Sequence, residues 1–163
     1  MRSAVYSGSF DPFTNGHLDV LKKACALFDT VYVAVLNNTS KRTAFTPEER
    51  KSLIETVIAD NGLKNAQAVT FEGLLVDLMR ELNASYIVRG LRSPADYDYE
   101  AQMERANRHL MPKAQTVYFS ADAEHSFISS TIVREMARYD ADLTQFVPRE
   151  IITDVKNKLQ SRR

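Results

Sequence analysis

Short runs of β-branched and aromatic residues alternate along the chain with longer segments in which apolar residues recur every three or four positions. The first pattern is typical of buried strands and the second of amphipathic helices. Most strand candidates are apolar on both faces, as parallel strands covered by helices are. The predicted strands are Ala4–Ser7, Val31–Leu36, Ala68–Phe71, Tyr86–Val88 and Thr116–Phe119. This alternation predicts an α/β fold with a doubly wound, five-stranded parallel sheet.

Helices are predicted between and after the strands. Thr46 is expected to cap one of them, because Pro47 and two acidic residues follow it and stabilise a first helical turn. Apolar residues share one face over Leu18–Phe28 and again over Leu53–Ile58. Cys25 lies on the first face and is expected to be a core residue rather than a reactive thiol. Further helices are predicted over Leu74–Leu82, Ala95–Leu110, Ser130–Tyr139 and Pro148–Leu159.

Composition narrows the classes of function. The chain has 163 residues, of which 21 are basic and 21 acidic, so the formal net charge is zero. Dedicated nucleic-acid binders carry a basic excess, so no nucleic-acid partner is expected. A single cysteine cannot form an internal disulfide. One cysteine and three scattered histidines also offer no zinc ligand set. No apolar run approaches the roughly 20 residues that span a bilayer. We expect a single cytoplasmic domain, residues 1–163, without a membrane partner.

The loop after the first predicted strand carries the first candidate chemistry. It contains neither GxGxxG nor GxxxxGK[ST], which argues against a dinucleotide dehydrogenase and a P-loop ATPase. Gly16 would let a ligand approach the start of the following helix, where free N–H groups favour a phosphate. The helix dipole is expected to lower the pKa of His17, which could donate an N–H to a phosphoryl oxygen. A glycine turn followed by a histidine in the capping region is the alternative.

Cations and hydroxyls recur where the other predicted strands end. Lys41 follows the second strand, Arg89 and Arg92 follow the fourth, and a serine-rich segment ending at Ser130 and Thr131 follows the fifth. The carboxyl ends of parallel strands share one edge, where ligands bind in open α/β sheets. Alternatively, the lysine lies in an exposed basic loop and the hydroxyls only cap a helix. Arg89 would need an anionic partner, because it ends an apolar strand.

The segment YSGSFDPFTNGH resembles the YPGTFDP-x-TNGH signature of the bacterial phosphopantetheine adenylyltransferases, nucleotidyltransferases that carry a T/H-x-G-H motif. Ser7 stands where the family often has proline, and Ser9 replaces threonine but keeps the hydroxyl. Further motifs match in order and spacing, and the resemblance covers nearly the whole chain. They include SK at 40–41, RGLR at 89–92, YE at 99–100, NRHLMP at 107–112 and FISS at 127–130.

The resemblance implies a Rossmann-like nucleotidyltransferase fold with C-terminal helices. It also implies transfer of the adenylyl group of ATP to 4'-phosphopantetheine, giving dephospho-coenzyme A and pyrophosphate in the penultimate step of coenzyme A synthesis. Mg²⁺ would arrive with ATP rather than occupy a metal site of the protein. The resemblance also implies coenzyme A as a regulator and a homohexamer, the typical assembly of the family.

Site residues follow from the resemblance position by position. His17 would contact the α-phosphate, and Ser9 would orient the attacking phosphate, which Lys41 and Arg89 would hold. Leu75 and Asn107 would line the pantetheine arm, although this leucine is equally an ordinary helix-core residue. The alternative for Glu100 is a surface acid, and the alternative for His125 is a contribution from its backbone alone. The residues implied to bind ATP are Ser9, Phe10, His17, Gly90, Leu91, Arg92, Glu100, His125, Ser126, Phe127, Ile128, Ser129, Ser130 and Thr131.

Two other classes of function stay open at this stage. One is an adenylyltransferase or cytidylyltransferase of the same superfamily with another phosphate acceptor. The other is a non-catalytic nucleotide-binding module, since a fold alone does not establish an activity. A module without activity would be expected to lack His17, Lys41 or Arg89, and all three are present.

Overall fold

All strands of the sheet pair in parallel, in the order β3-β2-β1-β4-β5. The structure is a computed structural model that describes residues 1–37 and 42–160. The predicted doubly wound, five-stranded α/β fold is confirmed. The strands are β1 (Ser3–Gly8), β2 (Thr30–Leu36), β3 (Ala66–Phe71), β4 (Tyr86–Leu91) and β5 (Gln115–Ser120).

The helices follow the sequence prediction closely. Thr46 caps its helix as expected, because its side chain accepts a hydrogen bond from the backbone N–H of Glu49. The predicted helix over Pro148–Leu159 instead begins with a short 3-10 turn, Arg149–Ile151. The helices are α1 (Asn15–Leu27), α2 (Pro47–Asp60), α3 (Leu75–Glu81), α4 (Pro94–Leu110), α5 (Ser130–Arg138) and α6 (Ile152–Gln160).

Apolar side chains pack on both faces of the sheet. The larger cluster joins the sheet to α1, α2, α5 and α6, whereas Val5, Ala34 and Ile87 pack against α3 on the other face. Cys25 is half-buried against the larger cluster, and burial raises the pKa of its thiol to about 11. Its predicted role as a core residue is therefore confirmed.

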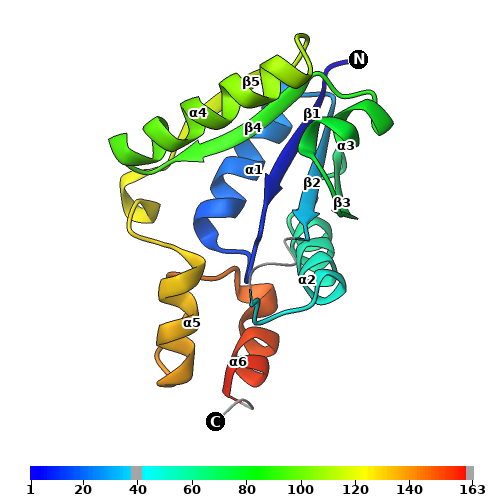
Figure 1. The fold of residues 1–163 in the computed structure, drawn as a ribbon. Coiled ribbons are helices and arrows are strands. Elements are labelled where there is room, and N and C mark those ends of the chain that lie inside the picture. The colour runs from blue at the N-terminus through cyan, green and yellow to red at the C-terminus, as the bar shows by residue number, and fades with distance from the viewer. Residues whose placement is uncertain (38–41, 161–163) are drawn as a thin grey trace.

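The C-terminal helices extend the molecule beyond the carboxyl ends of the strands. α5 and α6 lie below the ends of β1 and β2 (Figure 1). Hydrogen bonds tie this region to the β1–α1 loop and the start of α1. The Asn15 N–H donates to the Phe146 carbonyl at 2.9 Å, and the Ser130 hydroxyl donates to the Pro12 carbonyl at 2.8 Å. The N-terminus of α5 consequently faces the carboxyl end of β1.

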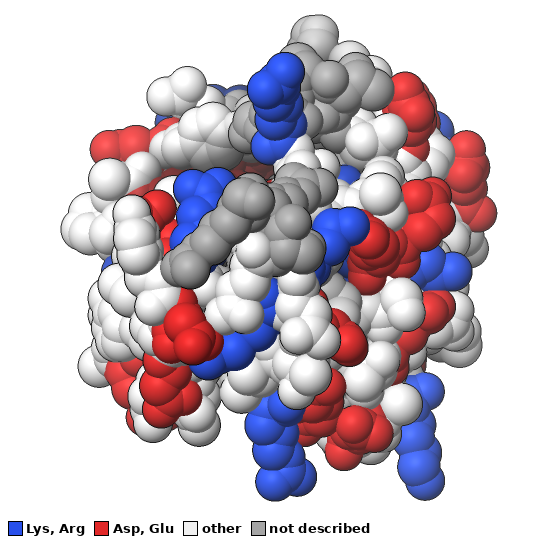
Figure 2. Space-filling model, turned by 90° about the horizontal axis from the view of Figure 1, so that it is seen from below, with Lys and Arg blue, Asp and Glu red and all other residues white. Residues whose placement is uncertain are grey.

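Charge is distributed evenly over the end of the molecule formed by α5 and α6. Basic and acidic side chains are interspersed on that face (Figure 2), in keeping with the zero formal net charge. Within residues 1–37 and 42–160, no helix combines the length and apolar character needed to cross a membrane.

Candidate active site

A cavity of about 410 Å³ opens at the carboxyl ends of β1 and β4. Its walls come from the β1–α1 loop, residues 42–43, the end of β4, the buried side of α4 and the N-terminus of α5. Most predicted site residues meet there, although they are far apart in the sequence. The predicted residues among those lining it are Ser9, Phe10, His17, Arg89, Gly90, Arg92, Glu100, Ile128, Ser129, Ser130 and Thr131.

His17 is held by the first turn of α1. Thr14 caps this helix and accepts a hydrogen bond from the His17 backbone N–H. In return, the imidazole Nδ1 accepts the Thr14 backbone N–H at 3.1 Å, as a glutamate does in the usual capping box. Because Nδ1 is an acceptor, the proton of the neutral ring lies on Nε2. His17 thus offers one N–H donor at the cavity wall.

The surroundings of His17 keep its imidazole neutral. The ring packs against Phe10 and Phe13, with centroid distances of 5.0 and 5.4 Å. Burial, followed by the positive charges of Arg92 and Arg89, lowers the pKa of His17 to about 3. The lowered pKa expected from the sequence is confirmed, but burial is its main cause, where the helix dipole had been expected. At neutral pH His17 can donate a hydrogen bond without carrying charge.

Arg89 has the anionic partner that its position in the sequence required. Its Nε donates to Glu100 Oε2 at 2.8 Å and its Nη2 to Glu100 Oε1 at 2.5 Å. A third hydrogen bond runs from Nη1 to the Ser7 carbonyl. Glu100 is buried, so the alternative of a surface acid is wrong. Burial lowers the pKa of Arg89, but hydrogen bonding and charge from Glu100 outweigh it and raise that pKa overall.

Arg92 lies near the cavity mouth and is more exposed than Arg89. It pairs with Asp96 at the start of α4, where the Nε to Oδ2 distance is 3.2 Å. Its Nη1 also donates to the Ile128 carbonyl at 3.1 Å. These contacts link the end of β4 to the segment that leads into α5.

The three hydroxyls at the start of α5 have separate partners. Ser129 caps the helix by accepting the backbone N–H of Ile132 at 3.2 Å, which confirms the capping alternative for this residue. Ser130 donates to the Pro12 carbonyl, and Thr131 Oγ1 accepts from Arg134 Nη2 at 3.2 Å. All three hydroxyl residues still line the cavity.

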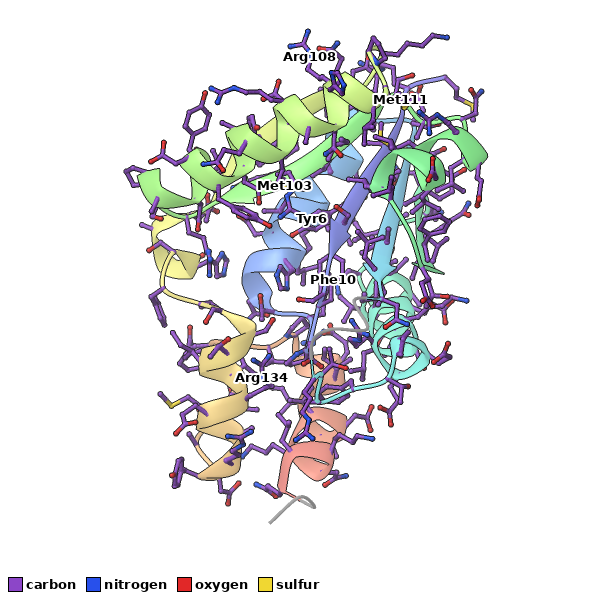
Figure 3. The ribbon with its side chains drawn as sticks, viewed as in Figure 1. Tyr6, Phe10, Met103, Arg108, Met111 and Arg134 are labelled. Carbon is purple, nitrogen blue, oxygen red and sulfur yellow. The ribbon has the colours of Figure 1, made fainter. Side chains whose placement is uncertain are left out.

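Four residues important to the site were not predicted from the sequence. Buried Asp11 accepts hydrogen bonds from the backbone N–H groups of Ala44 and Phe45 and pairs with Arg134, Nη1 to Oδ2, at 3.5 Å. Arg134 extends from α5 toward the β1–α1 loop (Figure 3). Buried Arg50 donates from Nη1 to the Ser9 carbonyl at 2.7 Å. Arg42 also lines the cavity.

Sequence signals for these residues existed but were weak. Asp11 lies inside the matched FDP segment, and Arg134 follows Ser130 by four positions, which places both on one helical face. The contacts themselves join residues more than 30 positions apart. Sequence spacing alone could not supply them.

Other predicted residues lie outside the described lining of the cavity. Leu75 is half-buried against the core cluster on the α3 face, and Asn107 lies near the end of α4. His125 lies close to the start of α1, since its backbone oxygen would be 3.8 Å from a Cβ at Gly16. Leu91, Ser126 and Phe127 complete this group, and Lys41 falls outside the described residues.

In the described part of the chain, one group of potential metal ligands consists of residues that do not themselves line the cavity. Ligand atoms of Asp19, Asp122 and His125 lie within 4.8 Å of one another. The Lys23 ammonium already contacts both carboxylates, at 2.8 Å from Asp19 and 2.9 Å from Asp122. The charge of both carboxylates is therefore already balanced in part by a side chain of the protein.

Comparison with known proteins identifies the family of the chain. Residues 5–136 match the family model described as cytidylyltransferase-like. The phosphopantetheine adenylyltransferase of Lachnoclostridium phytofermentans is 41% identical over 163 residues, which cover 100% of this chain and 99% of the relative. The enzyme of the same name from Clostridium novyi is 43% identical over 159 residues, or 98% of each chain.

Solved structures support the fold. A putative nicotinate-nucleotide adenylyltransferase from Vibrio parahaemolyticus superposes with a TM-score of 0.70 at 18% identity, covering 98% of this chain and 95% of the other. The Plasmodium falciparum nicotinic acid mononucleotide adenylyltransferase gives a TM-score of 0.67 at 17% identity, with coverage of 99% and 95%. With the full-length relatives above, these findings confirm the resemblance seen in the motifs: the chain belongs to the phosphopantetheine adenylyltransferase family of the cytidylyltransferase-like nucleotidyltransferases.

Proposed function

We propose that this protein transfers the adenylyl group of ATP to 4'-phosphopantetheine, giving dephospho-coenzyme A and pyrophosphate. The observation that carries the proposal is the neutral, Nδ1-anchored His17 in one cavity with Arg89 and Arg92. Such a cavity suits a reaction between two phosphate-bearing substrates. The choice of acceptor rests on the names of the full-length relatives.

The reaction needs no protein nucleophile. An oxygen of the acceptor phosphate attacks the α-phosphorus of ATP, a new P–O bond forms, and the bond from that phosphorus to the α–β bridging oxygen breaks. Pyrophosphate leaves with the electron pair of the broken bond. Because a phosphate monoester is largely ionised at neutral pH, no strong general base is required. Alignment and charge stabilisation can supply the catalysis.

His17 is proposed to stabilise the transition state. Its Nε2–H would donate to an α-phosphate oxygen and strengthen as negative charge builds there. The anchored Nδ1 holds the ring in place before the substrate arrives, so little reorganisation is needed. Arg92 and Ser130 would bind the departing pyrophosphate, at the cavity mouth and at the N-terminus of α5.

Arg89, Lys41 and Ser9 are proposed to hold and orient the acceptor phosphate. Arg89 lies in the last half of β4 and Ser9 in the loop after β1, so both reach the cavity from adjacent strands. Arg50 holds the backbone of Ser9 through a hydrogen bond to its carbonyl. Leu75 and Asn107 would contact the pantetheine arm, and the remaining residues implied by the family would bind ATP.

We also propose that Mg²⁺ enters with ATP and neutralises part of the charge on its phosphates. The acidic residues that line the cavity in the described part of the chain are Asp11, Asp96 and Glu100, and each is paired with an arginine. Oxygen ligands for the ion would therefore come mainly from the phosphates, as is common for Mg²⁺. A chelator should abolish turnover, and added Mg²⁺ should restore it.

The decisive experiment is a pyrophosphate-release assay across acceptors. ATP and CTP are each tested with 4'-phosphopantetheine, nicotinamide mononucleotide and glycerol 3-phosphate. We expect release only with ATP and 4'-phosphopantetheine. Activity with another acceptor and none with this one would assign the protein to a different reaction of the superfamily.

Assembly and location are further parts of the proposal. Family resemblance favours a homohexamer working in the cytoplasm, with coenzyme A as a regulator. Sedimentation velocity on the purified protein tests the oligomeric state. Titration of coenzyme A into the assay tests its regulatory effect.

A further inference from the structure

Helix α4 carries acidic side chains at intervals of four residues on the face that lies toward β4 and β5. Asp96 pairs with Arg92, Glu100 with Arg89, and Glu104 accepts from the Tyr118 hydroxyl at 2.9 Å. Residues four apart lie on one helical face, so all three acids face β4 and β5. Of the three, only Glu100 is buried.

The contact between Glu100 and Arg89 fixes the plane of the guanidinium. Two parallel hydrogen bonds, Nε to Oε2 and Nη2 to Oε1, form a bidentate pair, the geometry that gives an arginine–carboxylate contact its directionality. The Ser7 carbonyl holds a third N–H from the other side. Glu100 on α4 and Ser7 on β1 therefore hold Arg89 between them.

Counting donors shows what remains for a ligand. An arginine has five N–H groups, and Glu100 and the Ser7 carbonyl take three of them. One N–H group on Nη1 and one on Nη2 remain. The remaining group on Nη1 has only a longer contact, 3.4 Å, to the Ser7 hydroxyl. Arg89 also lines the cavity, so it can bind an anion there without releasing Glu100.

We propose that Glu100 is a positioning residue that acts through Arg89, holding the guanidinium so that its remaining N–H groups meet the acceptor phosphate. This inference rests on the proposed function, because it takes the acceptor phosphate as the ligand of Arg89. It adds to the direct ATP contact that the family implies for Glu100. The effect that Glu100 exerts through Arg89 is an effect on acceptor affinity.

The test compares Glu100→Gln with the matched control Glu104→Gln. Glutamine keeps the shape and one acceptor oxygen, but its amide group places a donor against Arg89 and breaks the bidentate pair. The control removes the same charge one helical turn away, where the partner is Tyr118. Calorimetry measures 4'-phosphopantetheine and ATP separately, after circular dichroism has shown that each variant is folded.

We expect Glu100→Gln to weaken 4'-phosphopantetheine binding about tenfold or more, the scale of a lost charge-assisted hydrogen bond. Glu104→Gln should leave the affinities for 4'-phosphopantetheine and for ATP near those of the parent. In an Arg89→Lys background the same Glu100 substitution should cost only about twofold, because lysine has no planar fork to orient.

Three outcomes would overturn the inference. One is a loss confined to ATP binding, and another is an acceptor loss of the same size in Glu104→Gln. The third is a loss that is undiminished in the Arg89→Lys background. If Glu100→Gln does not fold, Glu100→Asp serves instead: it keeps the charge but shortens the arm, and parent-like acceptor affinity would then contradict positioning. A parent protein that fails to bind 4'-phosphopantetheine at all would refute the proposed function, which is a separate result.

Discussion

At the scale of single residues, His17 uses its two ring nitrogens for different tasks. Nδ1 closes the capping box of α1 with Thr14, and the N–H on Nε2 is left for the cavity. The fold thereby selects the tautomer as well as the orientation of the ring. A change at His17 should consequently affect the chemistry and the stability of the protein in separable ways.

Replacing His17 by alanine should lower kcat far more than it raises KM for ATP. The proposed hydrogen bond strengthens in the transition state, so its loss falls on the chemical step. A loss of about a hundredfold or more is expected for one preorganised donor. The measurement is steady-state pyrophosphate release, and the control is His109→Ala, which changes an exposed histidine of α4. Parent-like turnover in the His17 variant would exclude its proposed role.

The lowered pKa of His17 predicts how stability depends on pH. The folded pKa is about 3 against 6.5 for the free side chain, so between these values the unfolded chain binds a proton that the folded chain rejects. The free energy of unfolding should therefore fall as the pH drops below 6.5, by up to about 1.4 kcal/mol per pH unit from this group.

Urea unfolding at several pH values between 6.5 and 4.5 tests this dependence in the parent and in His17→Asn. Asparagine does not titrate, so the variant should lose stability less steeply than the parent over this range. Parallel slopes for the two proteins would show that His17 is not the group responsible.

At the scale of elements, β4 is longer than its sequence suggests. The prediction stopped at Val88, but Arg89, Gly90 and Leu91 continue the strand by pairing with Tyr118, Phe119 and Ser120 of β5. Arginine and glycine carry little strand signal of their own, so the extension depends on the neighbouring strand. Because the strand continues, Arg89 contacts Glu100 on α4, and Gly90 lies against α1.

The cores of the other strands were predicted correctly because their β-branched residues carry a strong strand signal of their own. Val31, Val33 and Val35 of β2, for example, are fully buried, so packing and local propensity favour the same structure. Strand and helix ends depend on tertiary contacts and were placed less accurately. The 3-10 turn at Arg149–Ile151 is one such end.

Gly90 permits the close approach of β4 to α1. A Cβ at this position would lie 2.9 Å from Val20 Cγ2, and Val20 is buried with a stiff, branched side chain. Gly90→Ala should destabilise the protein by about 1 to 3 kcal/mol, the cost of overpacking. Thermal unfolding measures this loss.

The double variant Gly90→Ala/Val20→Ala tests the physical reason. If the steric contact causes the loss, removing the valine methyls should make the two substitutions less destabilising together than the sum of their separate effects. Additive losses would point to a cause other than this contact.

At the scale of the whole molecule, the sequence predicted which chain segments meet but not how they are joined. His17, Arg89, Arg92 and Ser129 were found because parallel strands end at one edge and their loops converge there. Asp11 was missed because its partners, at positions 44, 45 and 134, are brought near only by folding. A single sequence without its fold gives no signal for such contacts.

Asp11 joins three segments that form the cavity: the β1–α1 loop, the segment before α2, and α5. Asp11→Ala would leave the backbone N–H groups of Ala44 and Phe45 and the charge of Arg134 without this carboxylate. Removing a buried carboxylate with such partners should cost about 3 kcal/mol of unfolding free energy. It should also speed amide hydrogen exchange at residues 44 and 45, because their hydrogen bonds are lost.

Asp29→Ala is the control for this prediction, because Asp29 is an acidic residue in an exposed ion pair with Arg2. Its removal should cost less than about 1 kcal/mol and leave exchange at residues 44 and 45 unchanged. Urea unfolding and exchange measured by NMR give the two quantities for each variant. Equal losses in both variants, with unaltered exchange at 44 and 45, would mean that the cavity walls are held together without Asp11. A selective loss would instead make this carboxylate the structural link between the strand-end loop that carries His17 and the helix that carries Ser130.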